Sequence, residues 1–287
     1  MAAAHLACMA SMLVWAAGLP AADWVIGRLP PLQLTAARLW LAIEGRAALA
    51  RVDWRRAALV GSVGFVGGAV CLVMAQARTD AVTVAIISAM IPAVGVGMEV
   101  ISGTRRASLR LILGLALSLA GGIAAYAVRL ADFGLGLGAV FAFGSVLAFT
   151  WTSRETVRAF PELTALGRTA ATITGAALVG TLAAGIEAAV TGPPDRARLG
   201  WPQLAALIVF GTGAIGVSQL LWIVSVGRLG IGVASLHGNA TPFYVMLLAW
   251  ALGSAWAWPQ AAGAVLVVAG VMVATHAPRL DARAARP

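Results

Sequence analysis

The chain is a succession of apolar stretches, each close to twenty residues long, joined by short segments that carry most of the arginines. A bilayer core needs about 20 consecutive apolar residues per transmembrane helix. Measured at that length, the sequence predicts ten membrane spans, at residues 3–22, 32–49, 57–77, 81–102, 108–127, 134–152, 163–186, 203–226, 231–253 and 257–276. The predicted fold class is therefore an all-α membrane protein with ten transmembrane helices.

Composition supports a membrane protein over a soluble one. Hydrophobic residues make up 61% of the 287 residues and charged residues 11%, and the mean hydropathy is +0.91. A soluble domain carries roughly 25% charged residues. Residues 1–22 resemble a secretory signal peptide at their end, but no Arg or Lys precedes the apolar run, as a signal peptide requires. We interpret this segment as the first span.

The arginines predict how the chain is oriented in the membrane. With the N-terminus in the cytoplasm, the inner segments hold Arg46, Arg51, Arg55, Arg56, Arg105, Arg106, Arg110, Arg154, Arg158, Arg228, Arg279, Arg283 and Arg286. The outer segments then hold Arg28, Arg78, Arg129, Arg196 and Arg198. Loops rich in Arg and Lys stay in the cytoplasm. We therefore expect a multi-pass protein of the bacterial inner membrane, with both termini and a short tail, 277–287, in the cytoplasm.

Several classes of function are disfavoured by what the sequence contains. The net charge of +9 suggests nucleic acid binding, but the arginines lie between spans, where they contact anionic lipid. We therefore expect the lipid bilayer and a small-molecule substrate as partners, and no nucleic acid. Both cysteines, Cys8 and Cys71, fall in apolar segments, so a disulfide or a Cys-based metal site is not expected. We expect no metal or other cofactor, and no site for ATP.

Two parts of the sequence resemble each other. When the sequence is shifted by 150 residues, Gly61 matches Gly211, Arg78 matches Arg228, and Pro92 matches Pro242. A shift of 149 residues matches Gly114 with Gly263 and Gly121 with Gly270. A shift of 130 residues matches Pro31 with Pro161 and Arg38 with Arg168. The sequence thus predicts two five-helix halves, 1–127 and 134–276. Because five is odd, the halves enter the membrane from opposite sides. Such inverted repeats are typical of transporters that work by alternating access, although channels and some membrane enzymes share them.

These features resemble a known family. Pro31 and Arg38, and Pro161 and Arg168, open the second helix of each half with the same spacing, and Pro92 and Pro242 lie within the fourth helices. With ten spans in two halves, the chain resembles the EamA-type permeases of the drug/metabolite transporter superfamily. The resemblance implies a central cavity between helices one to four and six to nine, and export of amino acids or other metabolites. One branch with this layout is the YddG-like aromatic amino-acid exporters.

The ninth span carries the densest polar cluster. Ser235 and Asn239 are four residues apart, as are His237 and Thr241, so each pair shares a helix face. Pro242 removes a backbone hydrogen bond and frees a carbonyl near residue 238. Polar groups beside an opened backbone can bind a zwitterionic solute, so we expect this cluster to bind substrate and Pro242 to act as a hinge. The alternative is that these side chains join helices as packing groups.

Other spans offer fewer candidates. The fourth span, equivalent to the ninth, contributes Thr83 and Ser88 to the predicted substrate site and Pro92 as the second hinge. An aromatic wall with a few hydrogen-bonding groups suits an amphipathic organic solute. The further candidates of that kind are Trp15, Gln219 and Trp222. Since polar residues concentrate on one of the two fourth helices, the site is expected to be asymmetric.

The charged residues inside spans have two possible roles. Arg38 and Arg168 lie within the second helix of each half, and Glu99 lies near the end of the fourth span. A charge in the membrane interior requires a partner, water or a lipid headgroup. We expect Glu99 to pair with Arg105 or Arg106 or, alternatively, to couple transport to an ion. Gly114, Gly121 and their equivalents are expected to pack helices closely, either within each half or between the subunits of a dimer.

We therefore predict a secondary transporter, not an enzyme, that exports small organic metabolites. Amino acids, aromatic ones among them, are the favoured substrates; nucleosides, sugars and cationic compounds are the alternatives. An intramembrane hydrolase built on Ser235 and His237 is disfavoured because residues two apart on a helix point in different directions. A channel is the third possibility. His237 is the deepest titratable candidate for proton coupling, and the protein is expected to be a monomer or homodimer.

Overall fold

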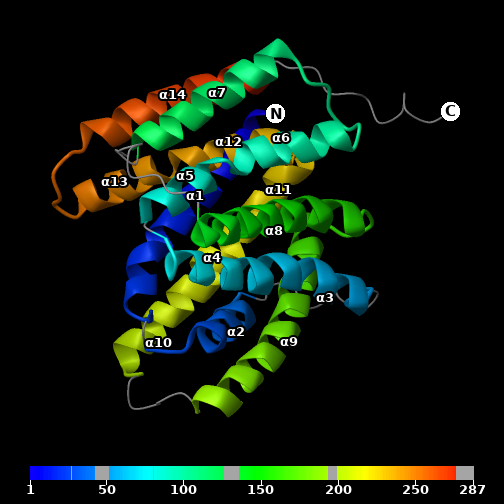
Figure 1. The fold of residues 1–287 in the computed structure, drawn as a ribbon, viewed down its shortest axis with the longest axis vertical. Helices are drawn as coiled ribbons and strands as arrows, with labels where there is room; N and C mark the ends of the chain where they lie inside the picture. Colours follow the sequence, from blue (N-terminus) through cyan, green and yellow to red (C-terminus); the bar gives the residue numbers. More distant parts are fainter. Residues whose placement is uncertain (27, 43–51, 80, 126–135, 193–198, 276–287) are drawn as a thin grey trace.

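The structure, a computed structural model, describes residues 1–26, 28–42, 52–79, 81–125, 136–192 and 199–275 (Figure 1). Every regular element in these residues is a helix. The predicted cytoplasmic tail, 277–287, lies outside the described residues.

The helices follow most of the predicted spans, but the helix in the predicted span 32–49 ends at Leu41, and residues 43–49 lie outside the described residues. Residues up to 125 form α1 (Ala2–Asp23), α2 (Pro31–Leu41), α3 (Trp54–Ser62), η2 (Val63–Gly67), α4 (Gly68–Gln76), α5 (Ala81–Ala89), α6 (Ile91–Ile101) and α7 (Leu109–Ala125). Residues from 137 on form α8 (Leu137–Ala159), α9 (Ala165–Thr191), α10 (Trp201–Ile208), η5 (Val209–Val217), α11 (Ser218–Leu229), α12 (Ile231–Leu236), η6 (His237–Ala240), α13 (Thr241–Ala251) and α14 (Trp258–Thr275).

Several of these helices are long and apolar enough to cross a bilayer. Among the described residues, five qualify by length and hydropathy: Trp54–Gln76, Thr83–Ile101, Ala165–Thr191, Trp201–Leu229 and Trp258–Thr275. Ala2–Gly18 and Leu109–Ala124 are shorter apolar helices. The predictions of an all-helical, multi-pass membrane protein are confirmed, whereas the number of ten spans and their inverted pairing stay predictions.

The surface of α9 shows how such a helix faces lipid. Leu178, Leu182, Ile186 and Val190 follow one another at intervals of four and are all exposed. This spacing places them on one face of the helix. A stripe of this kind would be costly in water but is favourable against lipid chains.

Two long helices contain a π-helical segment. The helix Trp54–Gln76 includes η2, and the helix Trp201–Leu229 includes η5. The five residues of η2, moved by the offset of 150, fall on the last five residues of η5. π-Bulges are rare and occur often at functional sites.

Two other helices are interrupted at equivalent positions. α5 ends at Ala89 and α6 begins at Ile91, while η6 ends at Ala240 and α13 begins at Thr241. Pro92 and Pro242 lie in the first turns of α6 and α13. In a first turn the missing proline N–H costs no hydrogen bond. The prolines therefore mark where each second segment starts, which is the position of the predicted hinges.

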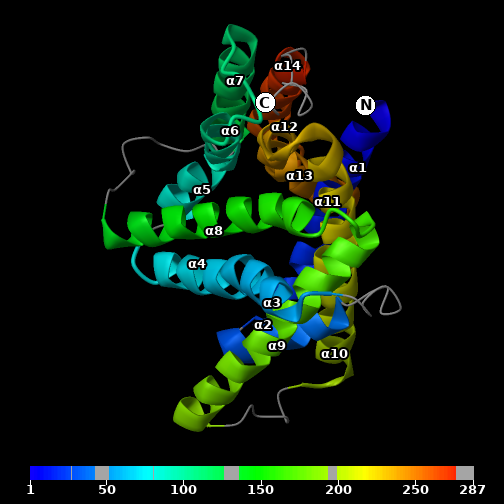
Figure 2. The same cartoon turned by 90° about the vertical axis from the view of Figure 1, so that its right-hand side faces the viewer.

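The strongest packing runs between the two predicted halves. α7 packs on α14, α3 and α2 on α9, α4 on α8, α1 on α11, and α6 on α12. Both views show α7 beside α14 and α4 beside α8 (Figures 1 and 2). Residues 1–127 and 134–276 are thus interlocked, and neither has a core that is separate from the other.

The repeated glycines pack helices closely, as predicted, but the pair of helices differs from both predicted alternatives. A Cβ atom on Gly121 would lie 2.5 Å from the carbonyl oxygen of Gly263, and one on Gly270 would lie 2.6 Å from that of Gly114. These glycines line the contact of α7 with α14, so they join the fifth helices of the two halves within one chain. Small residues permit this close approach of two backbones.

Polar residues set the starts of several helices. Asp53 caps α3 by accepting hydrogen bonds from the backbone N–H groups of Arg55 and Arg56, at 3.1 and 3.2 Å. Glu187, on α9, accepts from the N–H groups of Leu32 and Gln33 at the start of α2. A carboxylate at a helix N-terminus satisfies free N–H groups and interacts favourably with the helix dipole.

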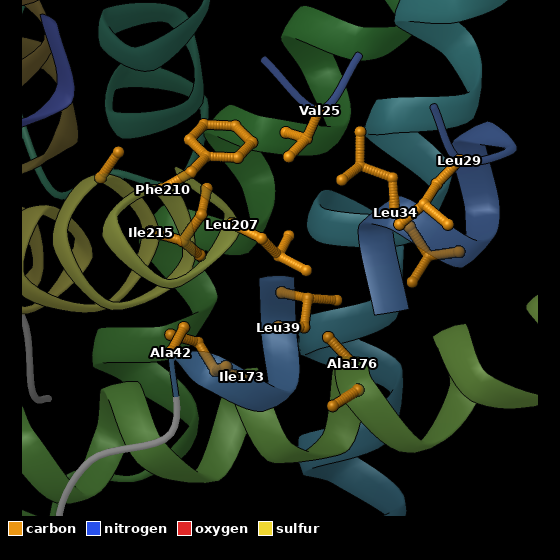
Figure 3. Close-up of a cluster of buried hydrophobic side chains, with 13 residues drawn as sticks. Val25, Leu29, Leu34, Leu39, Ala42, Ile173, Ala176, Leu207, Phe210 and Ile215 are labelled. Carbon is orange, nitrogen blue, oxygen red and sulfur yellow. The ribbon is translucent and has the colours of Figure 1, made fainter. Parts of the chain in front are cut away.

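The largest buried apolar cluster holds α2 in place. Leu34 and Leu39 of α2, and Ala42 directly after it, meet Ile173 and Ala176 of α9 (Figure 3). Leu207, Phe210 and Ile215, from α10 and η5, complete this cluster (Figure 3). Trp15 of α1 packs against it from the side.

Candidate functional site

The ninth predicted span is interrupted, forming α12, η6 and α13. Two of its polar side chains make hydrogen bonds to the backbone of this same segment. Ser235 donates to the carbonyl oxygens of Ile231 and Gly232, at 2.6 and 3.1 Å. The hydroxyl of Thr241 donates to the carbonyl of Gly238 at 2.6 Å. This is the carbonyl region that Pro242 was expected to free, and Thr241 binds it. Both hydroxyls therefore serve the local backbone.

Asn239 connects three helices. Its amide Nδ2 lies 3.3 Å from the carbonyl oxygen of Ala89, and 3.1 Å from both the carbonyl oxygen and the Oγ of Ser118. Ala89 is the last residue of α5, and Ser118 lies in α7. With the offset of 150, Ala89 is the equivalent of Asn239 itself. The breaks in the two halves therefore touch each other directly, through a predicted substrate-binding residue.

His237 contacts the first helix. Its Nε2 lies 3.2 Å from Nδ1 of His5, and the two rings are 5.1 Å apart between centroids. His237 is only 6% exposed, and its Nδ1 is buried without a hydrogen-bond partner. His237 therefore has one unused polar atom inside the helix bundle.

An aromatic group lies where α8 meets α11. The indole N–H of Trp222 donates to the Oγ of Ser153 at 3.0 Å, and the Phe149 ring is 5.8 Å from the Trp222 ring. Gln219 lies one helical turn before Trp222, on the same side of α11. It is 8% exposed, and its Nε2 is buried without a partner. Aromatic faces and an unused amide donor together can bind an amphipathic solute.

The remaining predicted site residues lie on α1 and α5. Thr83 is fully buried and Ser88 is half-buried, both on α5. Trp15 faces the apolar cluster around α2. The predicted residues thus fall into three groups. The first is Gln219 with Trp222 on α11, and the second is His237, Asn239 and their neighbours in and beside η6. The third consists of single residues on α1 and α5.

Sequence reasoning missed three side chains that the structure adds. His5, Ser118 and Ser153 contact His237, Asn239 and Trp222 respectively. Each is a polar residue within or beside an apolar helix, and that signal was present in the sequence. Their partners lie far away along the chain, so the pairing itself could not be read from spacing.

The charged residues inside helices have structural partners. The prediction that Glu99 pairs with a nearby arginine is confirmed: Nε of Arg105 lies 2.5 Å from its carboxylate. Arg105 also donates through Nη2 to the carbonyl of Leu229 at 2.9 Å. Arg168 donates to the carbonyls of Phe160 and Pro161 at the end of α8, at 2.7 and 2.8 Å.

Arg38 differs from its equivalent Arg168. Its guanidinium lies 5.5 Å from the centroid of the Phe210 ring, a cation–π distance. Its Nε is buried without a hydrogen-bond partner. The described residues contain no group of three or more His, Cys, Asp or Glu side chains that could hold a metal ion.

Comparisons with known proteins agree with this architecture. Residues 2–126 match the model of the EamA-like transporter family. One solved structure, described only as a crystal structure of a protein, is 20% identical with a TM-score of 0.77, over 96% of this chain and 97% of that one. This likeness shows a shared fold along almost the whole chain. No curated protein matches.

The family match carries a coarse functional conclusion. EamA-like proteins are membrane transporters of the drug/metabolite type, not enzymes. By this match, residues 2–126 are similar to the EamA-like transporter family.

Proposed function

We propose that the whole chain is an EamA-type secondary transporter whose ten helices form two inverted five-helix halves, working by alternating access. The observation that carries this proposal is the repetition of irregular backbone at one offset. A shift of 150 residues places η2 on η5, and the break before Ile91 on the break before Thr241. The same shift places Gly103 on Gly253, and both glycines have positive φ. Irregularities of this kind rarely coincide unless two segments share one ancestral backbone.

The break regions support alternating access. Discontinuous helices near the middle of the membrane are typical of transporters built from inverted repeats. Here the two breaks meet at the contact between Asn239 and Ala89. A rearrangement of one break therefore changes the contacts of the other, so that the halves exchange conformations together.

The substrate class follows from the groups around Trp222. The rings of Trp222 and Phe149 offer apolar faces, and the free Nε2 of Gln219 offers a donor for a carboxylate or carbonyl. We propose export of small organic metabolites, with amino acids, aromatic ones included, as the favoured class. Nucleosides, sugars or cationic compounds are the alternative. The family match does not select the branch of aromatic amino-acid exporters.

An enzyme would require different geometry. The hydroxyl of Ser235 donates a hydrogen bond to the carbonyl of Ile231 in its own helix, and the ring of His237 is hydrogen-bonded to that of His5. In the described structure these two residues form no nucleophile–base hydrogen bond, which a serine hydrolase requires.

The arginine distribution supports a place in the bacterial inner membrane with both termini in the cytoplasm. The α7–α14 contact uses the repeated glycines within one chain. These glycines are thus not available for a dimer, so we favour a monomer over a homodimer.

Counterflow tests the proposal. Purified protein is placed in liposomes preloaded with unlabelled L-phenylalanine, L-tryptophan, L-alanine, uridine or glucose, and uptake of the labelled compound is followed. We expect exchange of the aromatic amino acids to exceed that in protein-free liposomes. Exchange of uridine or glucose alone would support the alternative substrates. If no compound exchanges faster than in protein-free liposomes, the transporter proposal is wrong.

A variant locates the substrate site. Gln219→Leu keeps the side-chain volume and removes the amide donor. A hydrogen bond to a charged group contributes about 1.5–3 kcal/mol, so we expect L-phenylalanine exchange to fall by about tenfold or more. Gln203→Leu, in α10 of the same long helix, is the matched control and should exchange like the wild type. Equal exchange by both variants would exclude Gln219 from the site.

A further inference from the structure

The contact of His5 with His237 joins the two predicted halves through two titratable rings. His5 lies on α1, and His237 is the first residue of η6, the short segment between α12 and α13. Their nitrogens, Nδ1 and Nε2, are 3.2 Å apart. Because each neutral imidazole has one N–H and one acceptor nitrogen, the neutral pair shares a single hydrogen between these atoms.

The pair can accept one more proton. A proton from water binds the lone pair of a free ring nitrogen, either Nε2 of His5 or Nδ1 of His237, and changes the charge of the pair from zero to +1. The shared hydrogen bond then joins an imidazolium to an imidazole and becomes stronger. A second added proton would turn both facing nitrogens into donors and break the contact. The geometry therefore suits the binding of one proton.

The surroundings make this pair more than a packing contact. His237 is nine-tenths buried, and its Nδ1 has no partner, although a buried polar atom is normally hydrogen-bonded. His5 is only half-buried, so the pair can be reached from outside the helix bundle. The backbone carbonyls of Val233 and Ala234 lie beside the His237 ring, so an added proton on this ring would find acceptors close by.

The pair is also connected to the elements expected to move. Two residues after His237, Asn239 bonds the carbonyl of Ala89 and the side chain of Ser118. The segment that carries the imidazole thus carries the contact between the two breaks. A change in the charge of the pair acts directly on η6 and, through Asn239, on the break of the other half.

We propose that His5 and His237 together bind the proton that couples solute transport to a pH gradient. This proposal rests on the proposed transport function and names its driving ion. One proton binds to the pair on one side of the membrane, and it is released when α1 and η6 separate on the other side. No further reactant is needed.

Other charged and titratable groups lie on the elements packed against the pair. Glu99 of α6 is bound to Arg105, so its charge is already balanced. The remaining groups are the amino group of Met1, Cys8 on α1, Tyr244 on α13, Arg228 on α11, Arg110 on α7, and Arg154, Glu155 and Arg158 on α8. Glu99 and Glu155 are hydrogen-bonded to Arg105 and Arg154, so among the described residues the two imidazoles are the best-placed groups to exchange a proton.

The first test measures the proton directly and needs no solute. The chain has three histidines, so ¹⁵N-histidine NMR of the His276→Ala variant in lipid nanodiscs reports the pair alone. We expect the signals of the two rings to change together in a titration from about pH 8 to 3, as for coupled groups. In the same background, His5→Gln should shift the midpoint of His237 by about one pH unit or more, as for coupled groups. Rings that keep their shifts over this range, or that titrate independently, would overturn the proposal.

The second test uses transport of labelled L-phenylalanine. For one proton exchanged per solute, a gradient of about one pH unit supports about tenfold accumulation. For each variant, the accumulation is divided by the counterflow rate of the same variant. This ratio corrects for differences in the amount of active protein. We expect His5→Gln to lower the ratio about tenfold, whereas His276→Gln should keep the wild-type ratio.

The outcomes separate this inference from the transport proposal. Wild-type protein that shows counterflow but no accumulation under a pH gradient would refute proton coupling and leave transport intact. Absence of counterflow would refute the transport proposal, and the NMR titration alone would then decide whether the pair binds a proton.

Discussion

The ends of α6 and α13 have the same backbone and opposite chemistry. Each helix ends in a glycine with positive φ, Gly103 at 68° and Gly253 at 96°. In each, the next N–H donates to a carbonyl five residues back, Thr104 to Glu99 and Ser254 to Ala249, both at 2.9 Å. The buried Glu99–Arg105 pair flanks the turn after α6, whereas the turn after α13 is flanked by tryptophan rings packed edge to face, Trp250, Trp256 and Trp258.

The helix breaks differ in the same way. At equivalent positions α5 has Ile87 and Ala89, where η6 has His237 and Asn239. The backbone caps are nearly identical: Met90 has φ −80° and ψ −4°, and Ala240 has φ −85° and ψ −3°. The fold thus repeats, while the polar groups that can bind or switch are concentrated on the second copy. The backbone is therefore similar in the two halves, whereas the polar side chains proposed to function lie mainly in the second half.

The largest expected effect comes from breaking the buried ion pair that only the first copy has. Glu99→Leu leaves Arg105 charged and buried, with side chains 8% and 3% exposed in the wild type. Removing one partner of a buried pair costs about 3–5 kcal/mol. We expect a clear loss of thermal stability, measured by tryptophan fluorescence in detergent.

Two further variants control this result. Glu155→Gln removes a partly exposed pair with Arg154 and Arg158, and such pairs contribute about 1 kcal/mol or less. Glu99→Leu with Arg105→Leu removes both charges and should recover much of the loss. An equally unstable double variant would show that the charge left behind is not the cause.

The second test addresses the contact where the two copies are most alike. Gly270→Val places a Cβ 2.6 Å from the carbonyl oxygen of Gly114, and overpacking costs typically about 1–3 kcal/mol. The helices α7 and α14 should separate and the melting temperature should fall. Gly97→Ala, in α6, is the control because a Cβ there meets nothing within 4 Å. A Gly270→Val protein as stable as Gly97→Ala would contradict the close approach.

The third test removes the polar link between the two breaks. Asn239→Ala leaves the carbonyl of Ala89 and the side chain of Ser118 without this donor, which costs about 1–3 kcal/mol. Ser235→Ala removes only hydrogen bonds within one helix, and should lower stability by about 1 kcal/mol or less. Chemical denaturation of both variants gives the comparison. Equal stabilities would mean that Asn239 does not hold the breaks together.

Much of this fold follows from local physics and could be predicted. Apolar stretches of membrane length fix the helices, and Pro92 and Pro242 fix where the fourth helices restart. The pairing of Glu99 with Arg105 was predictable because the two residues are only six positions apart. Each of these features depends on residues close together along the chain.

The site was less predictable because its contacts are long-range. The partners His5 and His237 are separated by 232 residues, and Ser153 and Trp222 by 69. Spacing on a helix identifies a shared face but not the helix that this face meets. The glycines of α7 and α14 show the same limit: their close-packing role was correct, while their partner helix could not be known.

The smallest expected effect comes from the two prolines that mark the breaks. Pro92 and Pro242 lie in first helical turns, where proline displaces no hydrogen bond. Replacement by alanine therefore changes mainly the entropy of the unfolded chain, by less than about 1 kcal/mol. If the breaks are instead set by contacts such as Asn239 with Ala89, Pro92→Ala and Pro242→Ala should keep both the melting temperature and the counterflow rate nearly unchanged. A large loss of exchange in either variant would show that the proline itself forms the hinge. A loss in Pro242→Ala alone would show that the two halves differ functionally in their backbone as well as in their side chains.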